Sequence, residues 1–410
     1  MGEGGQGLGR QGGVSGERTH AGGIAAALAA GVVGAFYIGK LPAALPALKA
    51  EFSLSLVAAS WVVSTFNALA VFAAPLFGLA SDRVGALRFT LAGLAAMAAG
   101  GVLGALSPDE TVLLVSRFVE GAGFIAVVVG APALLVAATA PGRRKTVLGV
   151  WSAYMPFGGS VVMLAAPFAL GAWGWRGLWL AIALLTVGAT LAVLAMRNDY
   201  AAARPVGRRP IASVLEPLKR PGPWWLGLAF AFYTAQFSTV MVFLPTFLVE
   251  RGVPLPTAAL MTACYVAINV PGNLAGTWLL HRGVPRGGLI AATAAAMGVC
   301  AALALLPVLP NVARFAAALA LSGIGGMIPA AVLSGSQAHA RSPAETGGIQ
   351  GLFVQGATLG QFVGPPAAAA SVSAAGSWVA ALGVLGAAAT LGIVAGLMAA
   401  RFEPRPGDAR

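Results

Sequence analysis

Residues 197–222, RNDYAAARPVGRRPIASVLEPLKRPG, form a polar and basic stretch in the middle of an otherwise apolar chain. The 410-residue sequence is 58% hydrophobic and 9% charged. Ordinary soluble domains are roughly a quarter charged, and so few charges could not cover a water-facing surface of this size. We therefore expect the apolar surplus to face lipid and residues 197–222 to form a cytoplasmic linker between two membrane-embedded parts.

Long apolar runs lie on both sides of this linker. A helix needs about 20 apolar residues to cross a hydrocarbon core of roughly 30 Å. Six runs precede the linker and six follow it, near 21–45, 57–80, 88–106, 111–138, 146–170, 177–196, 223–248, 257–280, 288–307, 312–335, 346–371 and 376–400. The sequence therefore predicts an all-α integral membrane protein with twelve transmembrane helices in two pseudo-symmetric six-helix halves, 21–196 and 223–402.

The segments at the two ends of the chain are polar. Residues 1–20 are rich in glycine, and we expect a disordered cytoplasmic tail there and a second, short tail at 403–410. A cleaved signal peptide is the alternative for the first apolar run. However, that run continues beyond a usual signal sequence and many more runs follow, which favours a retained helix.

The basic residues predict the orientation of the chain. The formal net charge is +12, and most of the 25 Lys and Arg residues fall in segments that are cytoplasmic if both termini are inside. This distribution follows the positive-inside rule and favours cytoplasmic termini. A nucleic-acid binder would instead carry its basic residues on one continuous solvated face, so we expect no nucleic-acid partner.

The loop after the second apolar run reads GLASDRVGALR over residues 78–88. It resembles the signature loop between helices 2 and 3 of the major facilitator superfamily, although Ala86 stands where a basic residue is usual. The resemblance implies a conformational gate, because a carboxylate can cap helix-terminal N–H groups and pair with a cation. The gating residues expected on this basis are Gly78, Asp82, Arg83, Gly85 and Arg88.

Other segments resemble the same family along nearly the whole chain, from about residue 21 to 402. A weaker copy of the signature loop lies 198 positions later, where Gly276, Gly283 and Arg286 keep the spacing and Leu280 and His281 replace the Asp-Arg pair. Residues 117–123, 174–177, 347–351 and 364–366 also match family patterns. The general look of helices 1, 5 and 11 is similar to the cyanate/nitroimidazole-type permease group.

Ionisable residues inside a membrane are costly, and they face the bundle interior or a wet cavity. Of the 13 acidic residues, Glu120 alone falls inside a predicted span, roughly 13 Å deep at 1.5 Å per residue. Arg117 lies one turn away on the same helix face. Two interpretations stay open: Glu120 takes up a proton during transport while Arg117 modulates it, or the two residues form a fixed structural pair.

Lys40 is the other notable charge, three residues after Tyr37 on one face of the first helix. Its long side chain either reaches the outer interface or faces a substrate cavity together with Tyr37. Two cations and one acid would suit an anionic substrate. Further substrate-binding candidates are polar residues that could instead form hydrogen bonds between helices: Asn67, Tyr154, Gln236, Asn269, Asn273, Gln350, Gln355 and Gln361.

Nothing in the sequence indicates an enzyme, a metal site or a cofactor. Cys264 and Cys300 lie in apolar runs with no His or Cys at metal-ligand spacing. The three histidines fall outside the predicted helix cores, so a hydrolytic site at membrane depth is not expected. We also find no ATP-binding domain, and we therefore expect an ion gradient to drive transport.

These observations predict a monomeric secondary active transporter of the cytoplasmic (inner) membrane. We expect it to move a small organic or inorganic anion by alternating access, coupled to protons. The alternative is a proton-driven efflux pump for drugs or metabolites. Residues 155–159, MPFGG, depart from the Gly-Pro-x-x-Gly-Gly motif that drug–proton antiporters of the family carry in helix 5, which favours the uptake of an anion.

Overall fold

The computed structural model describes residues 19–151, 153–201, 216–307, 309–341 and 343–403. The first half contains α1 (Ala21–Glu51), α2 (Leu56–Val84), α3 (Ala86–Ala105), α4 (Glu110–Ala137), α5 (Arg144–Trp151) and α6 (Tyr154–Ala195). The second half contains α8 (Pro221–Val249), α9 (Leu255–Ala267), α10 (Asn269–His281), α11 (Arg286–Leu305), α12 (Asn311–Gly325), α13 (Met327–His339), α14 (Pro343–Ala375) and α15 (Ala381–Arg401). Short 3-10 turns lie at Pro141–Arg143, Arg197–Tyr200, Glu216–Lys219 and Trp378–Ala380.

The described helices are long enough for twelve membrane passes. Ten segments are long and apolar enough to cross a membrane, and one of them, 141–195, has 55 residues. That segment is long enough to cross twice, and Gly174, with a φ of 64°, divides α6 between the two passes. α14, with 33 residues, is long enough for one more pass. The predicted all-α fold with twelve transmembrane helices is therefore confirmed in the part of the chain that the structure describes.

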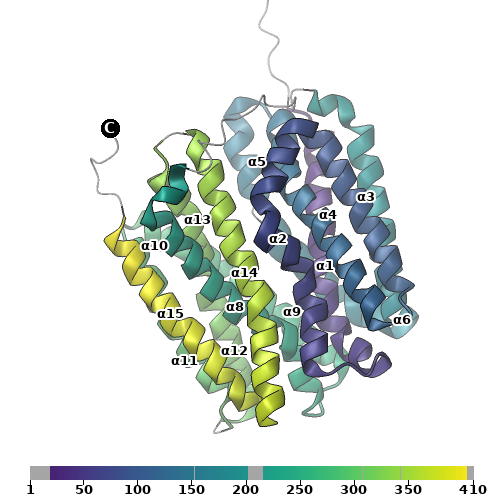
Figure 1. Ribbon diagram of the computed structural model, residues 1–410, viewed down its shortest axis with the longest axis vertical. Coiled ribbons are helices and arrows are strands. Elements are labelled where there is room, and N and C mark those ends of the chain that lie inside the picture. Colours follow the sequence, from purple (N-terminus) through teal and green to yellow (C-terminus); the bar gives the residue numbers. More distant parts are fainter. Residues whose placement is uncertain (1–18, 152, 202–215, 308, 342, 404–410) are drawn as a thin grey trace, which may run out of the picture.

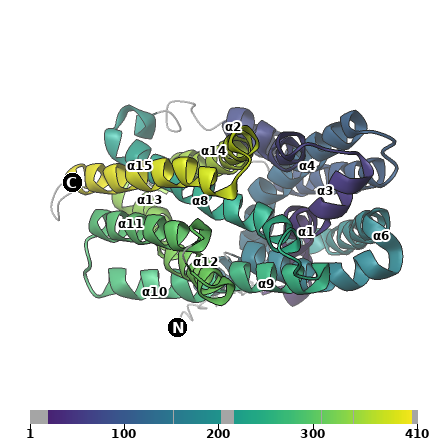
Figure 2. The same ribbon diagram turned by 90° about the horizontal axis from the view of Figure 1, so that it is seen from below.

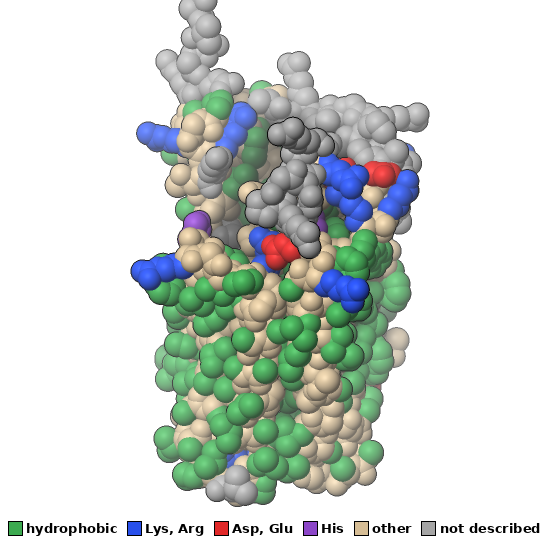
Figure 3. Space-filling model, turned by 90° about the vertical axis from the view of Figure 1, so that its left-hand side faces the viewer, with side chains coloured by type: hydrophobic (Ala, Val, Ile, Leu, Met, Phe, Trp, Pro, Cys, Tyr) green, Lys and Arg blue, Asp and Glu red, His purple; other side chains and the backbone are tan. Residues whose placement is uncertain are grey.

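The two halves lie side by side, with α1 to α6 on one side and α8 to α15 on the other (Figures 1 and 2). α1 begins and α15 ends at the same end of the bundle, which we call the termini end; the opposite end is the far end (Figure 1). Basic side chains gather at the termini end on the face shown in Figure 3. The predicted tails and the centre of the predicted linker (1–18, 202–215 and 404–410) lie outside the described residues.

An internal repeat is visible in the backbone. Gly85 and Gly283, which the sequence places at equivalent points, have φ values of 93° and 85° just before α3 and α11. At the far end, Gly174 and Gly376 have φ values of 64° and 65°. Glycine tolerates positive φ because it lacks a Cβ atom, so these four positions mark the same turns in both halves.

The far end repeats a side-chain contact as well. The indole Nε1 of Trp175 donates to Glu51 Oε2 at 2.5 Å, and that of Trp378 donates to Glu250 Oε2 at 2.7 Å. In each pair the acid lies at the end of the first helix of its half, and the indole follows a left-handed glycine. The two halves are therefore built on the same plan.

α2 and α14 form one of the contacts between the halves (Figure 2). The ring of Phe362 on α14 lies 5.6 Å from that of Trp61 and 6.3 Å from that of Phe72. Gln355 Nε2 donates to the carbonyl of Val71 at 3.1 Å. A second contact joins α6 to α9.

Candidate functional site

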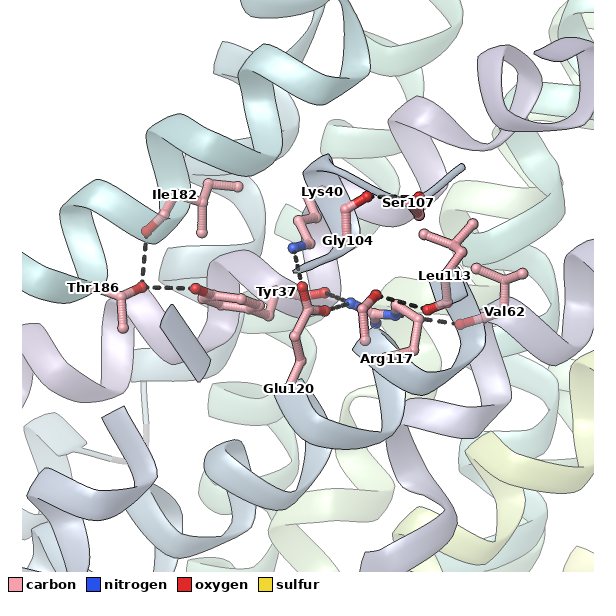
Figure 4. Close-up of polar contacts among 11 residues, drawn as sticks. Tyr37, Lys40, Val62, Gly104, Ser107, Leu113, Arg117, Glu120, Ile182 and Thr186 are labelled. Carbon is pink, nitrogen blue, oxygen red and sulfur yellow. Dashed lines mark hydrogen bonds and ion pairs between the residues drawn. The ribbon is translucent and has the colours of Figure 1, made fainter. Parts of the chain in front are cut away.

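A charged cluster joins α1 to α4 in the middle of the first half (Figure 4). Lys40 Nζ on α1 donates to Glu120 Oε1 at 2.8 Å. Arg117, one turn before Glu120 on α4, forms an ion pair with the other carboxylate oxygen. One carboxylate thus contacts two cations.

All three side chains of this cluster are withdrawn from solvent. Lys40 and Glu120 are 0% exposed and Arg117 is 1% exposed. Lys40 therefore does not extend to the interface. Removing charges from water is costly, and such groups persist when they are paired and hydrogen-bonded. Arg117 and Glu120 form an ion pair, and Lys40 contacts the same carboxylate, which leaves both interpretations of Glu120 open.

Aromatic rings surround the two cations. Lys40 Nζ lies 4.2 Å from the ring centroids of both Tyr37 and Trp179, and the Arg117 guanidinium lies 4.6 Å from that of Phe66. A cation over a ring face is attracted by the ring quadrupole, and the attraction grows when water is excluded. The aromatic rings therefore help to stabilise buried charge.

Hydrogen bonds fix the remaining polar groups of the cluster. Arg117 Nε and Nη1 donate to the carbonyls of Val62 and Tyr37, both at 3.2 Å. The Tyr37 hydroxyl and Thr186 Oγ1 lie 2.9 Å apart, and Thr186 donates to the carbonyl of Ile182 at 2.8 Å. α1, α2, α4 and α6 are thereby connected through one polar network (Figure 4).

Two glycines of α3 leave room for the cluster. A Cβ atom on Gly100 would lie 2.8 Å from Glu120 Cγ, and one on Gly101 would lie 3.0 Å from the Tyr37 hydroxyl. Real Cβ atoms essentially never approach other atoms more closely than 3.0 Å. A side chain at Gly100 would therefore force Glu120 to shift, and one at Gly101 would press tightly on the Tyr37 hydroxyl.

A small cavity lies between the halves next to the cluster. Its volume is about 20 Å³, and Arg117 and Asn67 of the first half line it together with Ser238 and Gln361 of the second. A space of this size holds about one water molecule. We call it the central cavity.

The structure separates the other predicted substrate-binding residues. Gln236 is buried on α8, and its Oε1 has no hydrogen-bond partner among the described residues. Asn269 donates to Tyr233 Oη at 3.0 Å and to the Ser322 carbonyl at 2.8 Å, which ties α10 to α8 and α12. Gln355 is bound to α2, as described above. These contacts are of the helix-packing kind.

Two further candidates lie apart from the charged cluster. Tyr154, at the start of α6, stacks on Trp151 with ring centroids 4.3 Å apart. Gln350 Nε2 lies 3.3 Å from Ser336 Oγ, which links α14 to α13. Neither residue is among those that line the central cavity.

The predicted gating loop lies at the termini end, where α2 meets α3. Gly85 has the left-handed backbone that a sharp turn needs, and Arg83 and Arg88 are exposed. The side chain of Asp82 and the surroundings of Gly78 lie outside the described part of the structure. A gating role for these residues stays a prediction.

Trp179 and Thr186 belong to the cluster and were missed by the sequence reasoning. They lie seven residues apart on α6, which is two helical turns and therefore one face. A Trp and a Thr in an apolar run are common packing residues, so this spacing alone gave a weak signal. Ser238, which lines the central cavity, likewise carries no distinctive pattern.

Comparison with known proteins identifies the family. The family model of the Major Facilitator Superfamily matches residues 24–365. The chain belongs to the Major Facilitator Superfamily. Within the described residues no group of three or more His, Cys, Asp or Glu could hold a metal ion.

Curated relatives of this superfamily member are distant. The Multidrug resistance protein B homolog of Mycobacterium tuberculosis is 28% identical over 36% of this chain, and the match spans 27% of that protein's length. The Cyanate transport protein CynX of Escherichia coli is 24% identical over 77% of this chain and 79% of that protein. The Putative niacin/nicotinamide transporter NiaP of Bacillus subtilis is 22% identical over 60% of this chain and 62% of its own.

Solved structures share the fold. A bacterial homolog of the human lysosomal transporter Spinster, in an inward-facing and occupied conformation, superposes with a TM-score of 0.78. The two sequences are 16% identical, and the superposition covers 94% of this chain and 98% of that one. The unoccupied conformation of that homolog gives a TM-score of 0.73.

Proposed function

We propose that this protein is a secondary active transporter that carries a small anion together with protons across the cytoplasmic membrane. The observation that carries the proposal is the buried cluster of Lys40, Arg117 and Glu120 beside the central cavity. With all three groups ionised, the cluster has one net positive charge. Arg117 lines the cavity, so an anion that enters between the halves would meet a cation.

We infer proton coupling because Lys40 and Arg117 both contact the carboxylate of Glu120. A proton on Glu120 would remove the negative charge that both Lys40 and Arg117 contact. Two buried cations would then lack a counter-ion, which is costly. An anion in contact with Arg117 would supply that counter-ion. Proton and anion would therefore each strengthen the binding of the other, as coupled transport in one direction requires.

The roles of the individual residues follow from their positions. We assign Glu120 to proton binding and Arg117 and Asn67 to contact with the anion, since both of the latter line the central cavity. Lys40 and Tyr37 would act through Glu120 and Arg117, because neither lines the cavity in this conformation. We keep Gly78, Asp82, Arg83, Gly85 and Arg88 as the proposed gate.

The names of two relatives agree with a small anion. Cyanate is a monoanion and niacin is a carboxylate at neutral pH, whereas nicotinamide, which the name of the second relative also includes, is uncharged. The concentration of basic residues at the termini end supports cytoplasmic termini. We further propose that the protein works as a monomer, with the alternation between its own two halves.

Efflux of drugs or metabolites is the second candidate. The match to the mycobacterial multidrug resistance homolog, at 28% identity, favours it. The mostly apolar lining of the central cavity, with Ile38, Pro42 and Met241, would also suit a lipophilic cargo. The two candidates differ in the charge of the cargo and in the direction of transport relative to the proton gradient.

Transport by purified protein in liposomes tests the proposal. With the outside acidified, we expect labelled nicotinate or cyanate to accumulate inside. Glu120→Gln should abolish this gradient-driven accumulation and keep exchange of the anion across the membrane, since exchange needs no net proton movement. Glu110→Gln, the same substitution ten residues earlier on α4, is the matched control and should transport normally.

Either of two results would overturn the proposal. One is undiminished gradient-driven accumulation in Glu120→Gln. The other is wild-type protein that exchanges lipophilic cations for protons and transports neither nicotinate nor cyanate. That result would establish the efflux alternative.

A further inference from the structure

The second half contains a larger cavity at the far end of the bundle. Its volume is about 230 Å³, and α8, α11, α12 and α15 supply most of its lining (Figure 1, lower left). We call it the far-end cavity. It shares no lining residue with the central cavity. On α8, Thr239 and Phe243 line the far-end cavity, whereas Ser238 and Met241 line the central cavity. The two cavities therefore lie on different sides of α8.

The internal repeat relates the far-end cavity to the equivalent place in the first half. Trp175 and Trp378 correspond, as their contacts with Glu51 and Glu250 show. Four residues later the first half has Trp179, which is 0% exposed, and the second half has the smaller Leu382. The offset between the two acids also pairs Lys40 with Thr239. Thr239 thus lines the far-end cavity at the position where the first half has Lys40, and the smaller side chain leaves more space.

The lining of the far-end cavity is largely hydrocarbon, with aromatic rings at Phe243, Phe247, Phe315 and Trp378. The deepest polar group is Thr239, which is 4% exposed and whose hydroxyl has no hydrogen-bond partner among the described residues. An empty cavity of roughly 150 Å³ lined by apolar side chains accommodates benzene. The far-end cavity could therefore take a larger apolar group, such as a medium-length alkyl chain.

Two arginines line the same cavity near its far-end mouth. The guanidinium of Arg251 lies 3.7 Å from the ring centroid of Phe247, and that of Arg314 lies 5.4 Å from it. Arg314 donates to the carbonyls of Ala304 and Leu305, both at 2.9 Å, and is thereby held in place. No acidic residue is among the described residues of the lining. Partial desolvation and the charge of Arg314 lower the pKa of the Arg251 guanidinium.

The nearest balancing acid is already engaged. Glu250, beside Arg251, accepts a hydrogen bond from Trp378 at 2.7 Å. The hydrogen bond leaves the charge of Glu250 in place, so two neighbouring cations and one carboxylate give a local excess of one positive charge, which an anionic group would relieve.

We propose that the far-end cavity binds a single-chain amphiphilic anion, with its chain between α8, α11, α12 and α15 and its anionic head at Arg251 and Arg314. An arginine fork suits a carboxylate or phosphate head, and the apolar lining suits the chain. The site lies outside the proposed transport path, and the inference does not rest on the proposed function.

Equilibrium binding of decanoate to the purified protein tests this site, with decanol as a neutral ligand of the same chain length. We expect decanoate to bind at least about tenfold more tightly than decanol, which corresponds to about 1.4 kcal/mol. Arg251→Gln should remove that preference, and the exposed position of Arg251 makes misfolding an unimportant risk. The matched control is Arg282→Gln, because Arg282 also stacks on an aromatic ring, 4.4 Å from that of Trp278, but at the termini end.

A second variant tests the position of the chain independently of charge. Ala301 lines the cavity and is 1% exposed, so Ala301→Leu should fill part of the space and weaken both decanoate and decanol. Equal affinity for the two ligands, or unchanged decanoate binding in Arg251→Gln, would overturn the proposal. Decanoate binding that survives in folded Ala301→Leu would also overturn it. Glu120→Gln should bind decanoate normally, which separates this site from the transport proposal.

The source of the amphiphile can be determined in the same assay. Protein in lipid nanodiscs of neutral phospholipid should bind decanoate as the detergent-purified protein does. If an anionic lysophospholipid, which has a single chain, competes with decanoate when it is added to the nanodiscs, the bilayer supplies the occupant. If it does not compete, the occupant is a free amphiphile, and the site as proposed holds in both cases.

Discussion

Lys40, Arg117 and Glu120 form a set in which each substitution leaves a different charge behind. Without Lys40, the Arg117–Glu120 ion pair remains balanced. Without Glu120, two cations remain in a region that is 0–1% exposed. A buried charge without a partner costs far more than a buried charge that is paired, so the acid should matter most for stability.

We therefore predict that Glu120→Gln lowers the thermal stability of the purified protein more than Lys40→Met does. Loss of one partner from a buried ion pair costs about 3–5 kcal/mol, and Glu120→Gln strands two cations at once. The apparent melting temperature in detergent measures the order of the variants. Glu110→Gln again serves as the control, and a Lys40→Met protein less stable than Glu120→Gln would contradict this account.

Part of this cluster could be predicted from the sequence. Arg117 and Glu120 are three residues apart in one apolar helix, and helical geometry places them on one face. Lys40 is 80 residues from Glu120 in sequence, and no local pattern specifies which face of α1 meets α4. For that reason the sequence left two positions possible for Lys40, the membrane interface and the substrate cavity. It gave no indication of Trp179.

At the scale of helices, glycine decides how closely elements approach. A Cβ atom on Gly121 of α4 would overlap the carbonyl oxygen of Phe66 on α2, and one on Gly272 of α10 would overlap that of Gly323 on α12. Small residues permit such backbone contact between membrane helices, where van der Waals packing is a main source of association. The α2–α4 contact also positions Phe66 over Arg117.

Gly121→Ala is accordingly predicted to destabilise the protein by about 1–3 kcal/mol, the usual cost of overpacking. Gly188→Ala on α6 is the matched control, because nothing lies within 4 Å of its added Cβ and the helix gains up to about 1 kcal/mol of propensity. Melting temperatures of the two variants should move in opposite directions. A Gly121→Ala protein as stable as the wild type would show that α2 and α4 can separate freely.

The existence of the helices was predictable because about 20 apolar residues per crossing is a strong physical constraint. Their internal breaks were not. α9 and α10 form one pass that is interrupted at Ile268, and α12 and α13 one pass that is interrupted at Gly326. Tertiary packing imposes such breaks, and the Gly326 break lies against Asn269 of α10, which a local pattern cannot reveal.

For the whole molecule, the small size of the central cavity has a direct consequence. A space of about 20 Å³ holds about one water molecule, so we expect the two halves to move apart when a solute enters the central cavity. Each half is tied internally by its own contacts, such as the network around Tyr37 in the first half and Asn269 in the second. Rigid-body movement of one half against the other is thus the motion that the packing allows.

A covalent bond between the halves should therefore stop transport. Gly159 on α6 faces α9, and its added Cβ would lie 3.9 Å from Val266 Cγ1. In a background with Cys264→Ser and Cys300→Ala, the pair Gly159→Cys and Val266→Cys should form a disulfide on oxidation and lose anion uptake in liposomes. Reduction should restore it.

The matched control places a disulfide within one half. A Cβ on Gly392 of α15 would lie 3.1 Å from that of Ala294 on α11, so Gly392→Cys with Ala294→Cys joins two helices that move together. Oxidation of this pair should leave uptake unchanged, because rigid-body motion does not alter distances inside a half. Uptake in the protein with the oxidised Gly159→Cys and Val266→Cys pair could instead be as fast as in the reduced protein. The solute would then cross without movement of the halves, and the hypothesis of alternating access would be wrong.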